Sequence, residues 1–600
     1  MDSILKTVRI GNAQAFWGDR ADAAVEMLAR EPGLDYLTLD YLAEVSMSIL
    51  AMQRERDPSA GYARDFVEVV RSLVPYWMSG GRCRVIANAG GLNPQGCAEA
   101  CRAVLTEVGC RPLQIGVVTG DDVLELLRGA NASSSDFQNL DTHAKLHEVR
   151  DHLVTANAYL GAWPIVDALA GGADIVVTGR VADPSLVVAP CIHHFGWNET
   201  ELNRLAGATV AGHLIECGTQ ATGGISTDWL DIPDAAHIGF PIVEISDDGS
   251  CVVTKPSGTG GRVGEMIVKE QLLYEIGDPA NYLSPDVTVS FLKLTVEDLG
   301  NDRVRVSGAT GARRPETLKV SATFRDGFRA AGTLTIIGRN ARAKARRVGA
   351  FVLQRVQGAG VTLRDTIVET ISSVVSSDQK DSPHPEGIEE SVLRVAVEAD
   401  DRDAVERFSR ELMPYITAGP QGTTGYAEGR PRVHQVFRYW PCLISQDVVA
   451  PQVTILSSVF GAAKTPSHAA PAPLPRSSAE RAVPLGHSQL ASMEAARTPT
   501  HLYDIAVARS GDKGISANIG VIVRRHDWWE FLEKWLTADA VATYFAPMGI
   551  ESVERFELPN LGALNFVIRG ALRRSLRTDA QGKALGQILL EMPLPEEAKK

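Results

Sequence analysis

The feature that most constrains this chain is a repeated order of strand, glycine-rich turn and helix in its first 200 residues. Apolar strand-like runs at 84–88 and 173–178 end in turns that contain glycine, and helical segments begin near Pro94 and Pro184. Strands that alternate with helices in this way build parallel sheets covered by helices. We therefore predict an α/β fold with a parallel-sheet N-terminal region and helices on both faces. Ligands of such sheets bind at the carboxyl ends of the strands.

Length and composition predict four parts in the 600-residue chain. At about 150 residues per domain, this length is too great for one core. We predict an α/β ligand-binding region over 1–285, an α+β region over 286–461, a linker over 462–500 and a small α+β domain over 501–600. The linker is predicted because that stretch is rich in Ala, Pro and Ser, a composition typical of extended, solvated chain.

The overall charge and the cysteines restrict the partners and the compartment. Sixty Lys and Arg residues stand against 73 Asp and Glu residues, which gives a net charge of −13 and argues against a nucleic-acid partner. No run of 18 or more apolar residues is present, so we expect no membrane span. The eight cysteines form no CxxC pair, which favours reduced, mostly buried thiols. We expect a cytoplasmic protein that binds a small-molecule substrate and forms a homo-oligomer.

Two strand ends in the first region carry candidate ligand-binding residues. At 88–94, Asn88, Gly90 and Gly91 stand between a strand and a helix, where free N–H groups favour an anion. A tight turn that only reverses the chain explains the same residues equally well. At 171–183, Arg180 is suited to a carboxylate or a phosphate. Asp183 is a candidate base, a partner that orients Arg180, or a helix cap before Pro184.

His213, Glu216 and Cys217 fall on one face of a predicted helix, because side chains three and four residues apart come together. A His beside a Glu is a candidate acid/base pair, and a nearby Cys is a candidate nucleophile. The alternative is a buried His that is hydrogen-bonded to Glu216, with an inert thiol beside it. A metal site would need a third ligand, which the sequence does not supply, so we predict no metal.

Two further loops are candidates for binding an anion. The loop at 254–264 combines glycines with basic and hydroxyl side chains, and its candidate residues are Lys255, Ser257, Gly258, Gly260, Gly261 and Arg262. It is neither a P-loop nor a dinucleotide fingerprint. In the last domain, Arg509, Ser510 and Lys513 lie in a loop after a strand, where they are candidates for holding an anionic group. Ser, Gly and Asp also favour ordinary turns, so a structural turn is the alternative there.

Long ordered motifs resemble the AtuA family, named for acyclic terpene utilisation. The similar stretches are RIGNAQAFWGDR at 9–20, NAGGLNP at 88–94, 157–184, GHLIECGTQATGG at 212–224, 239–285 and DRVRVSGATG at 302–311. The last domain resembles the family's ferredoxin-like domain through LYDIAVARSGDKGISAN at 502–518, LPN at 558–560 and ALNF at 563–566. The first loop departs from the family pattern at 12–14, where we expect smaller residues.

The resemblance implies a catabolic protein of geraniol- and citronellol-type degradation, which proceeds through branched acyl-CoA intermediates. It delivers no settled reaction and no catalytic residues. We expect an enzyme that acts on a small branched carboxylic acid or a CoA thioester by lyase, hydratase or hydrolase chemistry. Its cofactor is unknown, and no nicotinamide or flavin motif is present. The alternative is a non-catalytic accessory or scaffold subunit of a catabolic complex.

Overall fold

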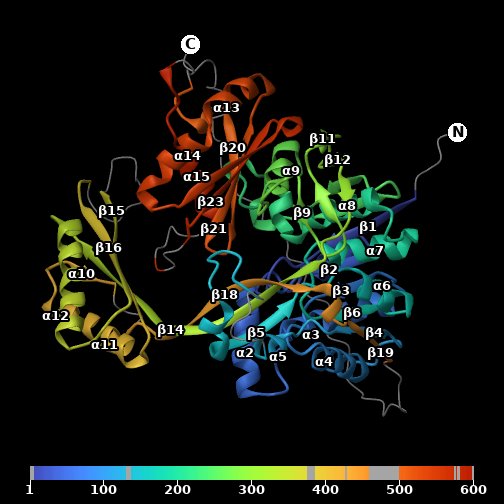
Figure 1. The fold of residues 1–600 in the computed structure, drawn as a ribbon, viewed down its shortest axis with the longest axis horizontal. Helices are drawn as coiled ribbons and strands as arrows, with labels where there is room; N and C mark the ends of the chain where they lie inside the picture. The colour runs from blue at the N-terminus through green and yellow to red at the C-terminus, as the bar shows by residue number, and fades with distance from the viewer. Residues whose placement is uncertain are drawn as a thin grey trace, which may run out of the picture.

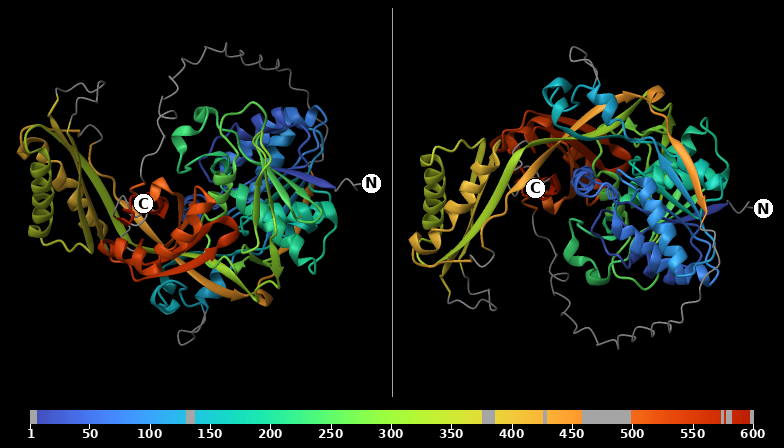
Figure 2. Two further views of the ribbon diagram at one scale, coloured as in Figure 1. Left: turned by 90° about the horizontal axis from the view of Figure 1, so that it is seen from above. Right: turned by 90° about the horizontal axis from the view of Figure 1, so that it is seen from below.

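The computed structural model contains three bodies, which are a main α/β body, an outer lobe and a C-terminal module (Figure 1). It describes residues 6–129, 137–374, 386–425, 429–457, 499–572, 576 and 582–596. Two long strands connect the outer lobe to the main body, and Arg394 of the lobe donates to the carbonyl oxygen of Leu576 in the C-terminal module (Figure 2).

A ten-stranded mixed sheet forms the main body. Its five central strands β1, β2, β3, β6 and β4 are parallel, and antiparallel strands extend it on both sides. In spatial order the strands are β11 (Thr295–Asp298), β12 (Val304–Ser307), β8 (Cys251–Thr254), β7 (Ile242–Ser246), β1 (Thr7–Asn12), β2 (Tyr36–Leu39), β3 (Arg84–Ala87), β6 (Ile175–Thr178), β4 (Gln114–Thr119) and β19 (Gln452–Ser457).

Helices cover both faces of this sheet because its central strands are apolar on both sides. Val85 and Ala87 of β3 belong to a core shared with helices α1 (Ala23–Arg30), α3 (Arg64–Met78) and α4 (Pro94–Glu107). Ile86, which points the other way, belongs to a core shared with α6 (Trp163–Ala170), α7 (Ser185–Phe195) and α8 (Leu202–Glu216). Strand side chains alternate between faces, so each strand contributes to both cores.

Shorter elements complete the main body. They are α2 (Glu44–Arg56), α5 (Leu124–Arg128), α9 (Glu265–Leu272) and a three-stranded sheet of β9 (Tyr282–Leu283), β10 (Thr288–Ser290) and β13 (Thr310–Ala312). All eight cysteines are free, and only Cys217 is partly exposed.

The outer lobe is built on the 21-residue strand β14 (Thr317–Ile337), which starts in the main body and ends in the lobe. In the main body β14 pairs with β5 (Leu153–Ala158) and β18 (His434–Ser445). In the lobe it pairs with β16 (Glu389–Ala399) and β17 (Thr423–Thr424), and β15 (Asp365–Val374) forms the edge beyond β16. The lobe helices are α10 (Ala341–Gly358), α11 (Arg402–Leu412) and α12 (Tyr415–Ala418).

The C-terminal module is a four-stranded antiparallel sheet with helices packed against it. Its strands lie in the order β20 (Ala506–Lys513), β21 (Ser516–Val523), β23 (Ala563–Arg569) and β22 (Ser552–Leu558). Its helices are α13 (Trp529–Trp535), α14 (Ala538–Phe545) and α15 (Gly582–Leu590), and they share a core with the sheet.

The predicted fold class is confirmed, with a parallel sheet between two helix layers and a small α+β module at the C-terminus. The predicted domain boundaries stay predictions. Strands β11, β12 and β19, which follow residue 285, join the same sheet as the strands before it. The predicted linker at 462–500 lies outside the described residues except for 499 and 500. Within the described part of the chain, no helix combines the length and apolar character that a membrane crossing needs.

Candidate functional site

A buried polar cluster lies at the carboxyl ends of the parallel strands. Asp40 follows β2, and Asn88 follows β3. The side-chain amide of Asn88 donates to Oδ1 of Asp40 at 2.7 Å, and its oxygen accepts from the backbone N–H of Tyr41 at 2.7 Å. Asn88 therefore links the ends of two neighbouring strands, and its amide is already used within the cluster.

Arg180, two residues after β6, is the central cation of this cluster. Its Nη1 lies 3.1 Å from Oδ1 of Asp183 and donates to the carbonyl oxygen of Leu42. The guanidinium also lies over the ring of Tyr159, 4.3 Å from the ring centroid. Arg180 is buried, whereas the Asp183 side chain is 32% exposed. Of the three predicted roles for Asp183, the pairing with Arg180 is the one that has a contact, and Pro184 occupies the cap position of α7.

Burial raises the pKa of Asp40 well above its usual value. The negative charge of Asp183 raises that pKa further, while Arg180 lowers it. A raised pKa at Asp40 reduces the negative charge that would otherwise be buried next to Arg180.

Asp121, which follows β4, joins the same network from the other side. Its Oδ2 accepts from the backbone N–H of Arg180 at 2.8 Å and from the side-chain amide of Asn157 at 2.7 Å. Burial raises the pKa of Asp121 to about 6, against the hydrogen bonds, which lower it.

Replacing Asp121 with Asn is expected to remove a pH dependence of stability. Because the pKa of Asp121 is higher in the folded than in the unfolded chain, its contribution to stability is present below pH 4 and is lost as the pH rises through about 6. The loss is about 3 kcal/mol for a shift of this size. The amide that replaces the carboxylate keeps an oxygen for both donors, so the fold should persist. Urea denaturation at pH 4.5 and 7 should show a difference between wild type and variant that changes with pH, and an unchanged difference would contradict the assignment.

His213 and Glu216 lie together at the end of α8, as the helical spacing predicts. The Nδ1–H of His213 donates to Oε1 of Glu216 at 3.1 Å. His213 is 1% exposed and packs against the rings of Tyr282 and Phe291, whereas the Glu216 side chain is 14% exposed. The pair is thus arranged with Glu216 nearer the solvent and His213 behind it. Asn12, at the end of β1, donates its side-chain amide to the carbonyl oxygens of Ile215 and Glu216 at 2.5 and 3.1 Å.

Acidic charges concentrate around the end of α8. Burial and the nearby charges of Glu216, Asp183 and Glu275 raise the pKa of the Tyr282 hydroxyl. Burial and the charges of Glu216 and Glu275 also raise the pKa of the Cys217 thiol. Cys217 is therefore held as a neutral thiol, which makes it a poor nucleophile in this arrangement.

Gly90 and Gly91 have a structural reason to be glycines. The N–H of Gly90 donates to the carbonyl oxygen of Thr178 at 3.0 Å, and a Cβ at Gly90 would lie 2.5 Å from that oxygen. Gly91 has a φ of +50°. The turn packs directly onto the end of β6, and the geometry favours the turn interpretation over the anion-binding one.

Several N–H groups of the loop at 254–264 bind backbone oxygens of neighbouring segments. The N–H groups of Gly260, Gly261 and Arg262 donate to the carbonyl oxygens of His237, Pro233 and Thr222. Arg262 also donates to the Asp231 carbonyl oxygen, Ser257 and Gly258 lie against α1, and Lys255 is only 7% exposed. These contacts hold the loop to its own surroundings, and its anion-binding role stays a prediction.

Replacing Lys255 with Ala is expected to lower the free energy of unfolding by about 1–2 kcal/mol. The Lys255 ammonium donates to the Thr259 carbonyl oxygen at 2.8 Å and lies 3.2 Å from Oδ2 of Asp302. The variant would leave the Thr259 oxygen without this donor. A thermal melt checks this, and an unchanged melting temperature combined with weakened ligand binding would instead favour the predicted anion role.

The three candidate anion-binding residues of the C-terminal module lie in different surroundings. Arg509 points into the main body, where it is 4% exposed and donates to Gln220 Oε1 and to the carbonyl oxygen of Ile225. Ser510 accepts from the N–H of Gly586 in α15 at 2.8 Å, which is a packing role. Lys513 is the last residue of β20, and only its backbone is described.

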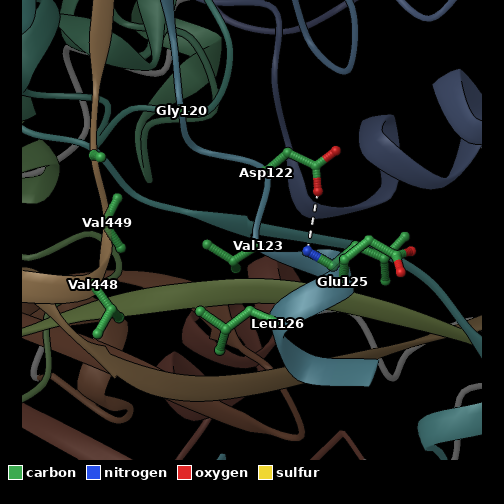
Figure 3. Close-up of a pocket in the computed structure, with 9 residues that line it drawn as sticks. Gly120, Asp122, Val123, Glu125, Leu126, Val448 and Val449 are labelled. Atoms are coloured by element: carbon green, nitrogen blue, oxygen red, sulfur yellow. Dashed lines mark hydrogen bonds between the residues drawn. The ribbon is translucent and has the colours of Figure 1, made fainter. Parts of the chain in front are cut away.

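A surface hollow of about 450 Å³ lies beside the cluster, where β4 ends (Figure 3). It is lined by Gly120, Asp122–Leu126 and Val448–Ala450. The Asp122 carboxylate accepts from the N–H of Leu124 at 3.0 Å and so begins α5. Asp121 points into the cluster while Asp122 belongs to this hollow, so the two sites are adjacent but built from different side chains.

Sequence reasoning did not include several residues of the cluster among the candidates. Asp40 had a usable signal, since it follows a parallel strand as Asn88 and Asp121 do. Tyr282, Glu275 and Tyr159 come from loops or edges with no spacing that relates them to α8. Among the described residues, no group of three or more His, Cys, Asp and Glu side chains is placed to hold a metal ion.

The fold defines a two-part α/β protein. Its first part carries a polar cluster at the carboxyl ends of a parallel sheet, and its second part is the small C-terminal module. Residues 8–455 match the family described as acyclic terpene utilisation family protein AtuA, and residues 500–595 match the AtuA ferredoxin-like domain. The chain belongs to the AtuA family, which confirms the resemblance and supports a role in acyclic terpene utilisation. A comparison with curated proteins finds no match.

Proposed function

We propose that this protein is an enzyme that acts on a small branched carboxylic acid or its CoA thioester, by lyase, hydratase or hydrolase chemistry. The observation that carries the proposal is the His213–Glu216 pair, which Asn12 ties to the carboxyl end of β1, and the charge of Asp183 acts on the same Tyr282 hydroxyl as that of Glu216. Each of these reaction types needs a group that takes or gives a proton near the substrate carbonyl. Membership of the AtuA family supports the substrate class.

Glu216 is the proton-transfer residue in this proposal. Its side chain is partly exposed, whereas His213 is fully buried and acts through Glu216 as a positioning residue. The hydrogen bond from Nδ1–H of His213 fixes the orientation of the carboxylate, and Asn12 holds the backbone at the end of α8. Asp183, fixed by Arg180, supplies a second carboxylate near the same hydroxyl of Tyr282.

A ligand panel tests the proposal against the accessory-subunit alternative. Thermal-shift measurements on the full chain with branched acyl-CoA thioesters, their free acids and CoA itself should give at least one clear stabilisation, because a bound ligand stabilises the folded state. Stabilisation by the thioester and by CoA, but not by the free acid, would assign binding to the CoA moiety. A flat panel would contradict the proposal and favour the accessory subunit.

A further inference from the structure

We propose that the C-terminal module is part of the candidate site, and that Arg509 positions the segment 217–227, which directly follows Glu216. The inference rests on the proposed function, since a positioning role matters only where the segment belongs to a reacting site. Its test needs no substrate, so it can fail independently of that function.

Arg509 reaches this segment from β20 of the C-terminal module. The guanidinium donates to the side-chain oxygen of Gln220 and to the carbonyl oxygen of Ile225, two acceptors five residues apart in the chain. It also lies over the ring of Tyr274, 5.0 Å from the centroid. A planar guanidinium that bridges two acceptors fixes their separation, which a single-point donor does not do.

The charge of Arg509 acts on titratable groups that lie around the end of α8. Glu270 and Glu275 both interact electrostatically with Arg509, and its charge lowers the pKa of the Cys217 thiol against the neighbouring carboxylates. Burying an arginine is costly unless partners compensate for the lost hydration. The compensation comes from residues of the main body, so the module is built to deliver this side chain there.

Hydrogen bonds of two asparagine side chains fix the position of the module against the main body. The side-chain amide of Asn518 donates to the Leu273 carbonyl oxygen at 2.6 Å and its oxygen accepts from the N–H of Glu275 at 2.9 Å. Asn565 donates to the carbonyl oxygens of Ile276 and Gly277 at 3.1 and 2.7 Å.

Close packing against Glu275 also accounts for a glycine of the C-terminal motif. A Cβ at Gly511 would lie 2.4 Å from Cγ of Glu275 and 3.1 Å from its backbone nitrogen, so a side chain here would require Glu275 to move. The views agree that the module packs beside α9, which immediately precedes these residues (Figures 1 and 2).

The same interface offers a matched control. Arg524 forms a two-pronged contact with Asp228, at 2.6 and 2.8 Å, one residue beyond the segment. Both side chains are partly exposed. Arg524→Gln therefore removes a two-pronged arginine contact between the module and the main body, and it leaves the contacts to 217–227 in place.

Hydrogen–deuterium exchange of the full-length chain tests the proposal. In Arg509→Gln, amides of the 217–227 peptide should exchange faster by about tenfold or more, because two hydrogen bonds from a charged donor are lost. Limited proteolysis followed by peptide mass spectrometry should also show faster cleavage within 217–227, because the segment is held less firmly. In Arg524→Gln both rates should stay near wild type. Arg509→Lys keeps the charge but replaces the planar fork with a single nitrogen, so its rates should fall between those of wild type and Arg509→Gln.

Two results would overturn the proposal. Unchanged exchange and cleavage in Arg509→Gln would mean that Arg509 does not position the segment. Equal acceleration in Arg509→Gln and Arg524→Gln would mean that the segment responds to loosening of the whole interface. If Arg509→Gln fails to fold, Arg509→Lys is judged against Arg524→Gln by the same criterion.

Discussion

Glu216→Gln is expected to reduce turnover on the order of 10²–10⁴-fold while leaving the fold intact, because it removes the proposed proton-transfer group. Gln keeps the size of the side chain and an oxygen that can accept from Nδ1–H of His213, as the carboxylate does at 3.1 Å. The helix end should therefore be preserved. Steady-state kinetics on the ligand identified by thermal shift measure the effect, and circular dichroism and the melting temperature serve as controls for folding.

His213→Asn is expected to lower turnover less than Glu216→Gln, because a buried positioning residue acts only through the carboxylate. The double variant should be no slower than Glu216→Gln alone, since residues that act as one unit have non-additive effects. If the two effects multiply, His213 and Glu216 act independently and the assigned roles are wrong. A near wild-type rate for Glu216→Gln would transfer the proton-transfer role to Asp183.

Arg180→Met is expected to lower the free energy of unfolding by about 2–3 kcal/mol, because it removes the buried cation that pairs with Asp183 and donates to the Leu42 carbonyl oxygen. The substitution leaves Asp183 without its cation and the Leu42 carbonyl oxygen without its donor. Arg262→Ala is the matched control, since Arg262 is exposed and makes one side-chain contact with a backbone oxygen. Its effect should stay within about 1 kcal/mol.

Urea denaturation followed by circular dichroism compares these two variants. The same midpoint for both would show that Arg180 does not hold the cluster together. Arg180→Met combined with Asp183→Asn should recover part of the loss, because the second change removes the carboxylate that the first leaves uncompensated.

The strand-and-turn pattern was sufficient to predict the sheet and the edge at which the polar cluster lies. Parallel strands end at one edge, so Asn88 and Arg180 were both predicted at the carboxyl-end edge of the sheet. Helical spacing similarly predicted that His213 and Glu216 lie on one face, and the hydrogen bond of a buried His213 to Glu216 is the structural alternative that the sequence offered for the pair. Both inferences depend only on short stretches of chain.

Other parts of the site depend on contacts between residues far apart in the chain. Tyr282 contacts His213 from a separate three-stranded sheet, and Arg509 binds Gln220, which is 289 positions earlier in the chain. Glycine-rich loops are ambiguous for a different reason, because glycine serves close packing and anion binding equally well. At Gly90 the neighbouring carbonyl oxygen of Thr178 gives the packing reason, and no local pattern contains that oxygen.

The most direct test of the account is a product analysis with branched acyl-CoA substrates. Each thioester that stabilises the protein is incubated with the wild type and with Glu216→Gln, and the CoA species are followed by mass spectrometry. Addition of water, release of free CoA or cleavage of the carbon chain distinguishes hydratase, hydrolase and lyase chemistry. The account predicts one such product from the wild type and a rate on the order of 10²–10⁴-fold lower from the variant. Equal product formation by both proteins, or no product from any thioester that binds, would contradict it.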